Sequence, residues 1–111
     1  MDKRKKQYLI NDEADLKTAM AQIEENNHRC VVIVNQNRQV VGTLTDGDIR
    51  KHLLHGNLLT APVREVMNLN FTALAADQRE RVRELFAANP HLILIPVVDA
   101  EGKLLDIVEA Y

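Results

Sequence analysis

Cysteine and aromatic residues are scarce in this chain of 111 residues, which holds one Cys, two Tyr, two Phe and no Trp. A single cysteine, Cys30, excludes an internal disulfide. Because Cys30 begins the apolar run 30–34, we expect a buried thiol rather than a nucleophile. The scarcity of aromatic residues leaves Val, Ile, Leu, Met and Ala to build the core, a composition that suits β-branched strands packed against helices.

Long apolar runs and a strong net charge are also absent. No segment reaches the roughly 18 apolar residues of a membrane-spanning helix, and the charged N-terminus does not resemble a signal peptide. The formal net charge of −2 provides no basic footprint for nucleic acid or an anionic membrane. We therefore expect a cytoplasmic chain with no nucleic-acid or membrane partner. The one basic run, 3–6, is expected to be a solvated tail rather than a phosphate-binding arm.

Sequence motifs of catalysis are missing too. The sequence has no Gly-x-x-x-x-Gly-Lys loop and suggests no Ser-His-Asp or Cys-His arrangement, so we predict no catalytic residue, no enzymatic activity and no cofactor. His52 and His55 lie three residues apart in a predicted helix, but structural metal sites usually need four ligands. We predict no metal site.

The first half of the chain shows alternating strand and helix patterns. Strands are predicted at 7–10, 30–34 and 40–45. A helix is predicted over 12–26, because Leu16, Ala19, Met20 and Ile23 share one face. A second helix is predicted over 46–55, with Gly56 as the residue that ends it.

The second half repeats this order. Strands are predicted at 71–74, 92–99 and 104–108, and a helix is predicted over 77–89 with Asp77 and Glu80 as a capping box. Adding 64 to positions 34 and 40 of the first half gives 98 and 104 of the second, in matching strands. The second copy has no final helix, because the sequence stops at Tyr111.

We therefore predict an α/β (α+β) fold of two tandem β-α-β-β-α repeats, over 1–60 and 61–111. One such repeat leaves a sheet face uncovered, so the two are expected to pack about a pseudo-twofold axis as one module.

The chemistry is predicted to lie at 42–50, where a buried strand ends and a helix begins. Backbone amides and the helix dipole at such a junction favour an anion. The Thr45 hydroxyl suits a phosphate oxygen, the Asp48 carboxylate suits the two hydroxyls of a ribose, and Gly47 leaves room between them. The same spacing is also typical of a helix cap, with Thr45 and Asp48 bonding only to the backbone. Both roles are compatible.

The sequence Gly-Thr-Leu-Thr-Asp-Gly-Asp-Ile-Arg at 42–50 resembles the ligand motif of the CBS-domain pair, or Bateman module. Pro-Val-Arg-Glu-Val-Met at 62–67 resembles the linker into a second CBS repeat, and Ile-Pro-Val-Val-Asp at 95–99 resembles the central strand of that repeat. The sequence at 44–50 is similar to the corresponding sequence of CBS pairs fused to sugar-1-phosphate nucleotidyltransferases. The resemblance thus implies a possible fragment of such an enzyme.

This resemblance implies a regulatory module that binds AMP, ADP or ATP, with phosphate and ribose held by Thr45 and Asp48. It places adenine against Ile10, Arg29 and Cys30. It also implies a homodimer, through helix surfaces at 53–54 and 82–86, and a fused or partner catalytic domain. The alternative is a structural dimerisation module whose ligand site is vestigial.

The second repeat departs from the motif. With the shift of 64, Asp106 stands in the place of Gly42 and Glu109 in the place of Thr45. A carboxylate at the phosphate position repels the ligand. We therefore predict one competent site per chain.

Overall fold

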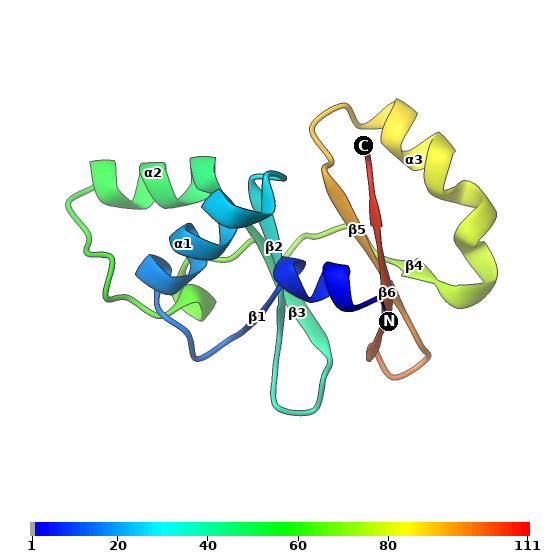
Figure 1. Cartoon of the computed structure of the whole chain (residues 1–111), viewed down its shortest axis with the longest axis horizontal. Helices are drawn as coiled ribbons and strands as arrows, with labels where there is room; N and C mark the ends of the chain where they lie inside the picture. Colours follow the sequence, from blue (N-terminus) through cyan, green and yellow to red (C-terminus); the bar gives the residue numbers. More distant parts are fainter. Residues whose placement is uncertain (1) are drawn as a thin grey trace.

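The computed structural model describes residues 2–111, which form two three-stranded sheets side by side with helices on their outer sides (Figure 1). A short 3-10 helix, η1, precedes the first sheet and lies in front of the space between the two sheets in this view. The first half contains η1 (Lys3–Tyr8), β1 (Leu9–Asn11), α1 (Leu16–Asn26), β2 (Cys30–Val34), β3 (Val40–Thr45) and α2 (Asp46–Leu54).

The second half repeats the strand order without a helix after its last strand. It contains the 3-10 helix η2 (Val63–Glu65), β4 (Leu74–Ala75), the 3-10 helix η3 (Ala76–Arg81), α3 (Val82–Ala88), β5 (Leu94–Val98) and β6 (Leu104–Glu109).

The two sheets have the same topology and register. In each, a short first strand pairs in parallel with the central strand, which pairs antiparallel with the third. Cys30 lies opposite Thr45 in the first sheet, and Leu94 lies opposite Glu109 in the second. Both members of the second pair follow from the first by adding 64, so the structure confirms the mixed α+β fold and the predicted alignment of the repeats.

The turns of the two hairpins contact each other reciprocally. Val40 N donates to Gly102 O at 3.0 Å, and Leu104 N donates to Arg38 O, also at 3.0 Å. Adding 64 to the donor of the first bond gives Leu104, and subtracting 64 from its acceptor gives Arg38, so the two contacts are related by a pseudo-twofold axis. Arg38 and Gly102 both have positive φ, 63° and 82°, a conformation that glycine adopts without the steric cost that arginine meets.

The core has two parts, and β2 contributes to both because it is buried on each face. Val31 and Ile33 point toward α1 and α2, where they join a cluster completed by Ile10, Leu16, Ala19, Ile23, Leu44, Ile49 and Val63. On the other face, Cys30 and Val32 pack against the second sheet in a cluster with Tyr8, Leu94, Leu104 and Ile107. Apolar burial therefore joins the two repeats directly.

Local capping fixes the helix ends. Asp15 caps α1 by accepting a hydrogen bond from Thr18 N at 2.8 Å, so this helix begins at Leu16 and not at residue 12 as predicted. It ends at Asn27, which adopts the left-handed conformation with a φ of 60°. Gly56 follows α2 with a φ of 86°, as expected for the residue after a helix.

The elements at the start of each repeat differ from prediction. Residues predicted as the strand 7–10 begin in a 3-10 helix, and the predicted strand 71–74 is reduced to β4. The predicted helix 77–89 is a 3-10 helix followed by α3. The Asp77–Glu80 capping box was wrong, because the helical segment starts earlier and Ala75 N donates to Gln78 Oε1 at 3.4 Å.

The boundary between residues 60 and 61 stays a prediction. Val63 packs in the core of the first half, and Leu16 N donates to Ala61 O at 2.9 Å. The first residues after the predicted boundary are therefore bound to the preceding repeat.

Candidate functional site

Thr45 and Asp48 form a reciprocal cap at the junction of β3 and α2. Asp48 N donates to Thr45 Oγ1 at 3.2 Å, and Thr45 N donates to Asp48 Oδ2 at 3.0 Å. The capping role is therefore confirmed. It leaves the Thr45 hydroxyl proton as a donor and Asp48 Oδ1 as an acceptor, since no other bond to either atom is present among residues 2–111.

The backbone amides at the start of α2 are already used within the protein. Asp46 N donates to Arg29 O at 3.2 Å, and Gly47 N donates to Asp46 Oδ1 at 2.9 Å. Asp48 N is bound to Thr45 as described above. The expectation that this turn presents exposed amides to an anion was wrong, because side chains of the turn itself and the backbone before β2 satisfy them.

A cleft of about 410 Å³ opens beside this junction. This volume lies within the range of about 300–1,000 Å³ of small-molecule sites. Both repeats contribute to its walls. The lining residues are Cys30, Thr43, Thr45, Asp48, Asn68, Phe71, Ala88, Asn89, Pro90, His91, Leu92, Ile93 and Leu94.

The structure brings three of the six predicted ligand residues together in this cleft: Cys30, Thr45 and Asp48. Ile10 is buried in the core of the first repeat, and Arg29 lines a separate hollow beside Asp46. Gly47 is not part of the cleft lining. A Cβ placed on it meets only ordinary contacts at 3.7 Å, so the fold itself does not demand glycine there.

The linker and the second repeat supply lining residues that the sequence did not identify. Asn68 N donates to Thr43 O at 2.7 Å, and Thr43 N donates to Asn68 O at 3.2 Å, which fixes the linker against β3. This close approach explains Gly42, where an added Cβ comes within 2.7 Å of the Met67 sulfur. Phe71 is then held at the cleft wall. The resemblance to a linker at 62–67 was the one available signal.

Cys30 sits at the base of this region as a buried, unreactive group. Burial raises the pKa of its thiol to about 12, and the negative charges of Asp48 and Asp46 act in the same direction. The expectation of a buried thiol is confirmed. A thiol with this pKa is not a nucleophile at neutral pH.

The equivalent position in the second repeat holds two carboxylates that are paired. Asp106 accepts from Lys5 Nζ at 3.0 Å and from Arg79 Nη1 at 2.9 Å. Glu109 accepts from the Tyr8 hydroxyl at 2.6 Å and faces Arg4 Nη2 at 3.5 Å. Two carboxylates and their cationic partners thus occupy the positions that correspond to Gly42 and Thr45 of the first repeat.

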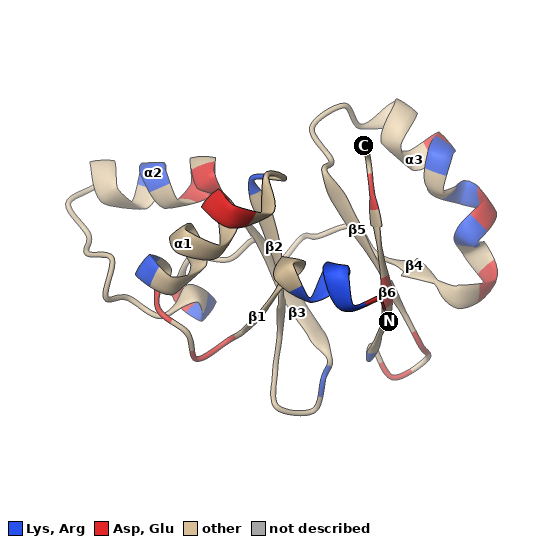
Figure 2. Ribbon diagram, in the orientation of Figure 1, with Lys and Arg blue, Asp and Glu red and all other residues tan. Residues whose placement is uncertain are grey.

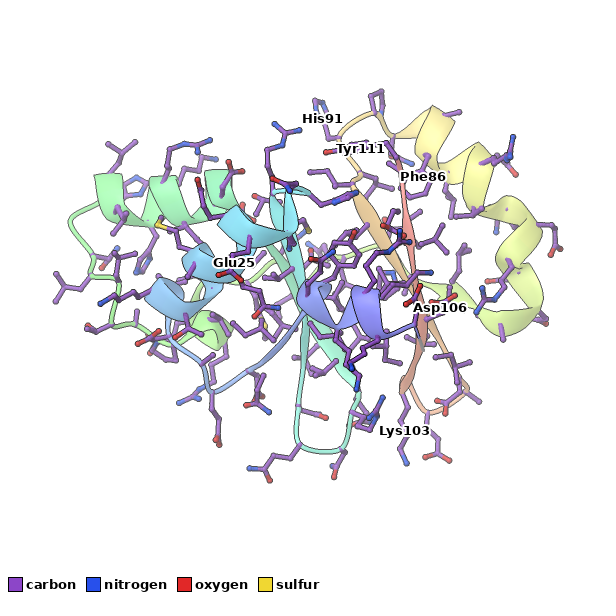
Figure 3. The ribbon with its side chains drawn as sticks, viewed as in Figure 1. Glu25, Phe86, His91, Lys103, Asp106 and Tyr111 are labelled. Atoms are coloured by element: carbon purple, nitrogen blue, oxygen red, sulfur yellow. The ribbon has the colours of Figure 1, made fainter. Side chains whose placement is uncertain are left out.

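These contacts correct the expectation of a solvated N-terminal tail for Arg4 and Lys5, whereas Lys3 and Lys6 are exposed as expected. The basic residues belong to η1, which lies against β6 in Figure 2, and Figure 3 places Asp106 beside it. Tyr8 is only 1% exposed. Although burial opposes the charge on Asp106, hydrogen bonds from Lys5, the Ile107 backbone and Arg79 hold its pKa below the usual value.

Within residues 2–111, no group of three His, Cys, Asp or Glu side chains is placed to hold a metal ion. None of the described helices has the length and apolar character needed to cross a membrane.

Fold and site define a module of two tandem repeats that share a core and together line the cleft beside Thr45 and Asp48. Residues 4–55 match the CBS domain family. The chain therefore belongs to the proteins that carry CBS domains, and its second repeat shares the fold of the first.

The curated relatives of this chain include arabinose 5-phosphate isomerases. Arabinose 5-phosphate isomerase GutQ of Escherichia coli is 33% identical over 91 residues, which is 82% of this chain and 28% of GutQ. The chain thus spans about 28% of the length of this relative. The expected link to a sugar-1-phosphate nucleotidyltransferase has no support among these relatives.

Solved structures share the fold over most of the chain. A CbpB protein of Listeria monocytogenes in complex with c-di-AMP superposes with a TM-score of 0.77 at 17% identity, covering 92% of this chain and 79% of that one. A CBS domain protein of Pyrobaculum aerophilum complexed with AMP gives a TM-score of 0.74 at 14% identity, with coverages of 91% and 78%.

Proposed function

We propose that this chain is a regulatory module that binds one adenine nucleotide in the cleft beside Thr45 and Asp48. One observation carries the proposal: both side chains line the same cleft while each keeps one hydrogen-bonding group unused by the cap. The Thr45 hydroxyl donates to a phosphate oxygen, and Asp48 Oδ1 accepts from ribose hydroxyls. No catalytic role is assigned to either.

The apolar part of the cleft provides the surface for the base. Cys30, Phe71 and the run 92–94 form walls on both sides of the space between the repeats. An aromatic ring and aliphatic side chains favour a flat heterocycle. The bound AMP and c-di-AMP of two proteins with this fold support an adenine ligand here.

Isothermal titration calorimetry with AMP tests the proposal through paired substitutions. Asp48→Asn keeps an oxygen that accepts from Thr45 N but loses the charge, so AMP binding is expected to weaken at least tenfold, about 1.4 kcal/mol, while stability changes little. Thr45→Val removes the donor and the cap, whereas the control Thr45→Ser keeps both. Unchanged AMP affinity in Asp48→Asn and Thr45→Val places the ligand elsewhere. Absence of heat with every adenine nucleotide refutes the proposal.

The regulated partner is proposed to be a sugar-phosphate isomerase domain, attached or separate, on the basis of the similarity to GutQ. Regulation requires that the ligand bind two states of the assembly with different affinity. Isomerase activity of the full-length parent protein, assayed with and without AMP, tests this. Identical activity at saturating AMP contradicts it.

Exposed apolar side chains on the first repeat favour a second candidate function, dimerisation. Leu54, at the end of α2, is 84% exposed, and Leu58 is 69% exposed. In the second repeat, α3 buries none of its residues. A homodimer through these helix faces removes this apolar surface from water. Sedimentation equilibrium of wild type and Leu54→Lys tests it, since a monomer at all concentrations excludes a role as a dimerisation scaffold.

A further inference from the structure

We infer that the cleft selects an adenosine ligand with at most one phosphate group, so that AMP binds more tightly than ADP and ADP more tightly than ATP. This inference rests on the proposed function and specifies the ligand class of the same cleft. It is carried by the charges around the cleft and by the hydrogen bonds of the helix that begins there.

The lining of the cleft lacks cationic side chains. Of the residues that the structure describes there, none is Lys or Arg, while Asp48 contributes a carboxylate. His91, which Figure 3 shows at the end of the loop before β5, is exposed at the rim. Proteins that hold di- and triphosphates surround them with Lys, Arg or a metal ion. No such charge faces this cleft.

The helix N-terminus does not replace those cations. The amides of Asp46, Gly47 and Asp48 all donate to oxygen atoms of the protein at 2.9–3.2 Å. Two carboxylates, Asp46 and Asp48, also stand in the first turn and complement the positive end of the helix dipole. A polyphosphate therefore meets negative side chains where other nucleotide sites present free amides.

Two cations, Arg29 and Arg50, line the hollow beside Asp46, outside the cleft, and the charge of Arg50 is already paired. Arg50 Nη1 donates to Asp46 Oδ2 at 3.2 Å, one turn earlier on α2. Asp46, Asp48, Arg29 and Arg50 together sum to zero charge, but of these four only the Asp48 carboxylate lines the cleft. Burial is the main cause of the raised pKa of Cys30, and the negative charges of Asp48 and Asp46 add to it in the same direction.

Thr45 matches a single phosphate. Its hydroxyl has one proton, and its oxygen already accepts from Asp48 N, so it offers one donor to the ligand. Each phosphate beyond the first adds negative charge without adding a donor. At an effective dielectric between protein surface and water, repulsion of this kind is expected to weaken binding by about tenfold per added phosphate.

Calorimetric titration of the whole chain with adenosine, AMP, ADP and ATP, without Mg²⁺ and with a chelator present, tests the inference. Dissociation constants are expected to rise from AMP to ADP to ATP, by about tenfold at each step, and adenosine is expected to bind at least as tightly as ATP. Higher salt is expected to narrow the difference, because screening weakens repulsion. ADP or ATP binding as tightly as AMP overturns the inference and leaves the proposed function intact. Absence of binding by all four overturns the proposed function itself.

The substitution Asp46→Asn supplies a second, independent arm. Asparagine keeps an oxygen that accepts from Gly47 N but removes the charge that pairs Arg50, and Asp46 does not line the cleft. The ratio of the ATP dissociation constant to the AMP dissociation constant is expected to fall several-fold, mainly because ATP binds more tightly. Glu25→Gln, on α1, removes an exposed carboxylate that has no ion pair among the described residues, so it changes the overall charge by the same amount and is the control. A ratio unchanged in Asp46→Asn contradicts the electrostatic account.

Discussion

Replacing Lys5 tests whether the N-terminal helix is part of the folded module. The Lys5 ammonium donates to Asp106 at 3.0 Å, and the two side chains are only 17% and 19% exposed. A hydrogen bond between charged groups contributes about 1.5–3 kcal/mol. We therefore expect Lys5→Met to lower the free energy of unfolding by about that amount and Tm by roughly 6–12 °C. Urea unfolding followed by circular dichroism measures the first quantity.

The pH dependence of this loss identifies its cause. The pKa of Asp106 is depressed in the folded protein, so its contribution is fully present above its ordinary pKa and is lost as pH falls through the lower, folded-state pKa. The difference between wild type and Lys5→Met is therefore expected to be largest near neutrality and to shrink in acid. Lys6→Met, which replaces an exposed neighbour, is the control and is expected to change stability by less than about 0.5 kcal/mol. Equal effects of the two substitutions, or a difference that persists in strong acid, refute the reasoning.

Three further predictions concern the core and the glycines. Tyr8→Phe removes the 2.6 Å bond to Glu109 and is expected to cost about 1.5–3 kcal/mol in urea unfolding; a loss below 0.5 kcal/mol contradicts the assigned bond. Cys30, with a thiol pKa of about 12, is expected to resist iodoacetamide in the native state and to react on unfolding. Rapid labelling of the native protein contradicts the burial of this thiol. Gly42→Ala is expected to destabilise the protein by about 1–3 kcal/mol through overpacking against the linker, whereas Gly47→Ala is expected to leave stability unchanged or raise it. If Gly47→Ala lowers Tm more than Gly42→Ala, the contacts assigned to the two glycines are contradicted.

Local signals in the sequence predicted the elements that local interactions form. The strand patterns at 30–34 and 40–45 correspond to β2 and β3 almost residue for residue. The helix after Thr45 was predicted because its cap lies within four residues of chain. The site followed in part, since Thr45 and Asp48 are neighbours in sequence as well as in the cleft.

Long-range contacts explain what the sequence did not reveal. Lys5 and Tyr8 bind residues 101 positions away, so the basic run appears solvated when only its neighbours in sequence are considered. The residues 92–94 enter the cleft from the opposite repeat for the same reason. Ile10 was placed in the cleft only by resemblance, but the side chains of a strand alternate between faces, and this one points into the first core.

The distribution of cations links the two pseudo-equivalent positions. In the second repeat, Arg4 and Lys5 compensate the charges of Glu109 and Asp106, which stabilises the module without a ligand. Asp106 and Glu109 are the counterparts of Gly42 and Thr45, so these ion pairs fill the place that a second nucleotide would need. The first repeat keeps Thr45 and Asp48 open to the cleft but has no Lys or Arg among its described lining residues. From this asymmetry we expect one ligand per chain. Binding of two equivalent ligands per chain would require η1 to leave β6 and so break the bond between Lys5 and Asp106. If a binding isotherm shows two such sites, the ligand-bound protein is therefore expected to unfold with the same free energy in wild type and Lys5→Met.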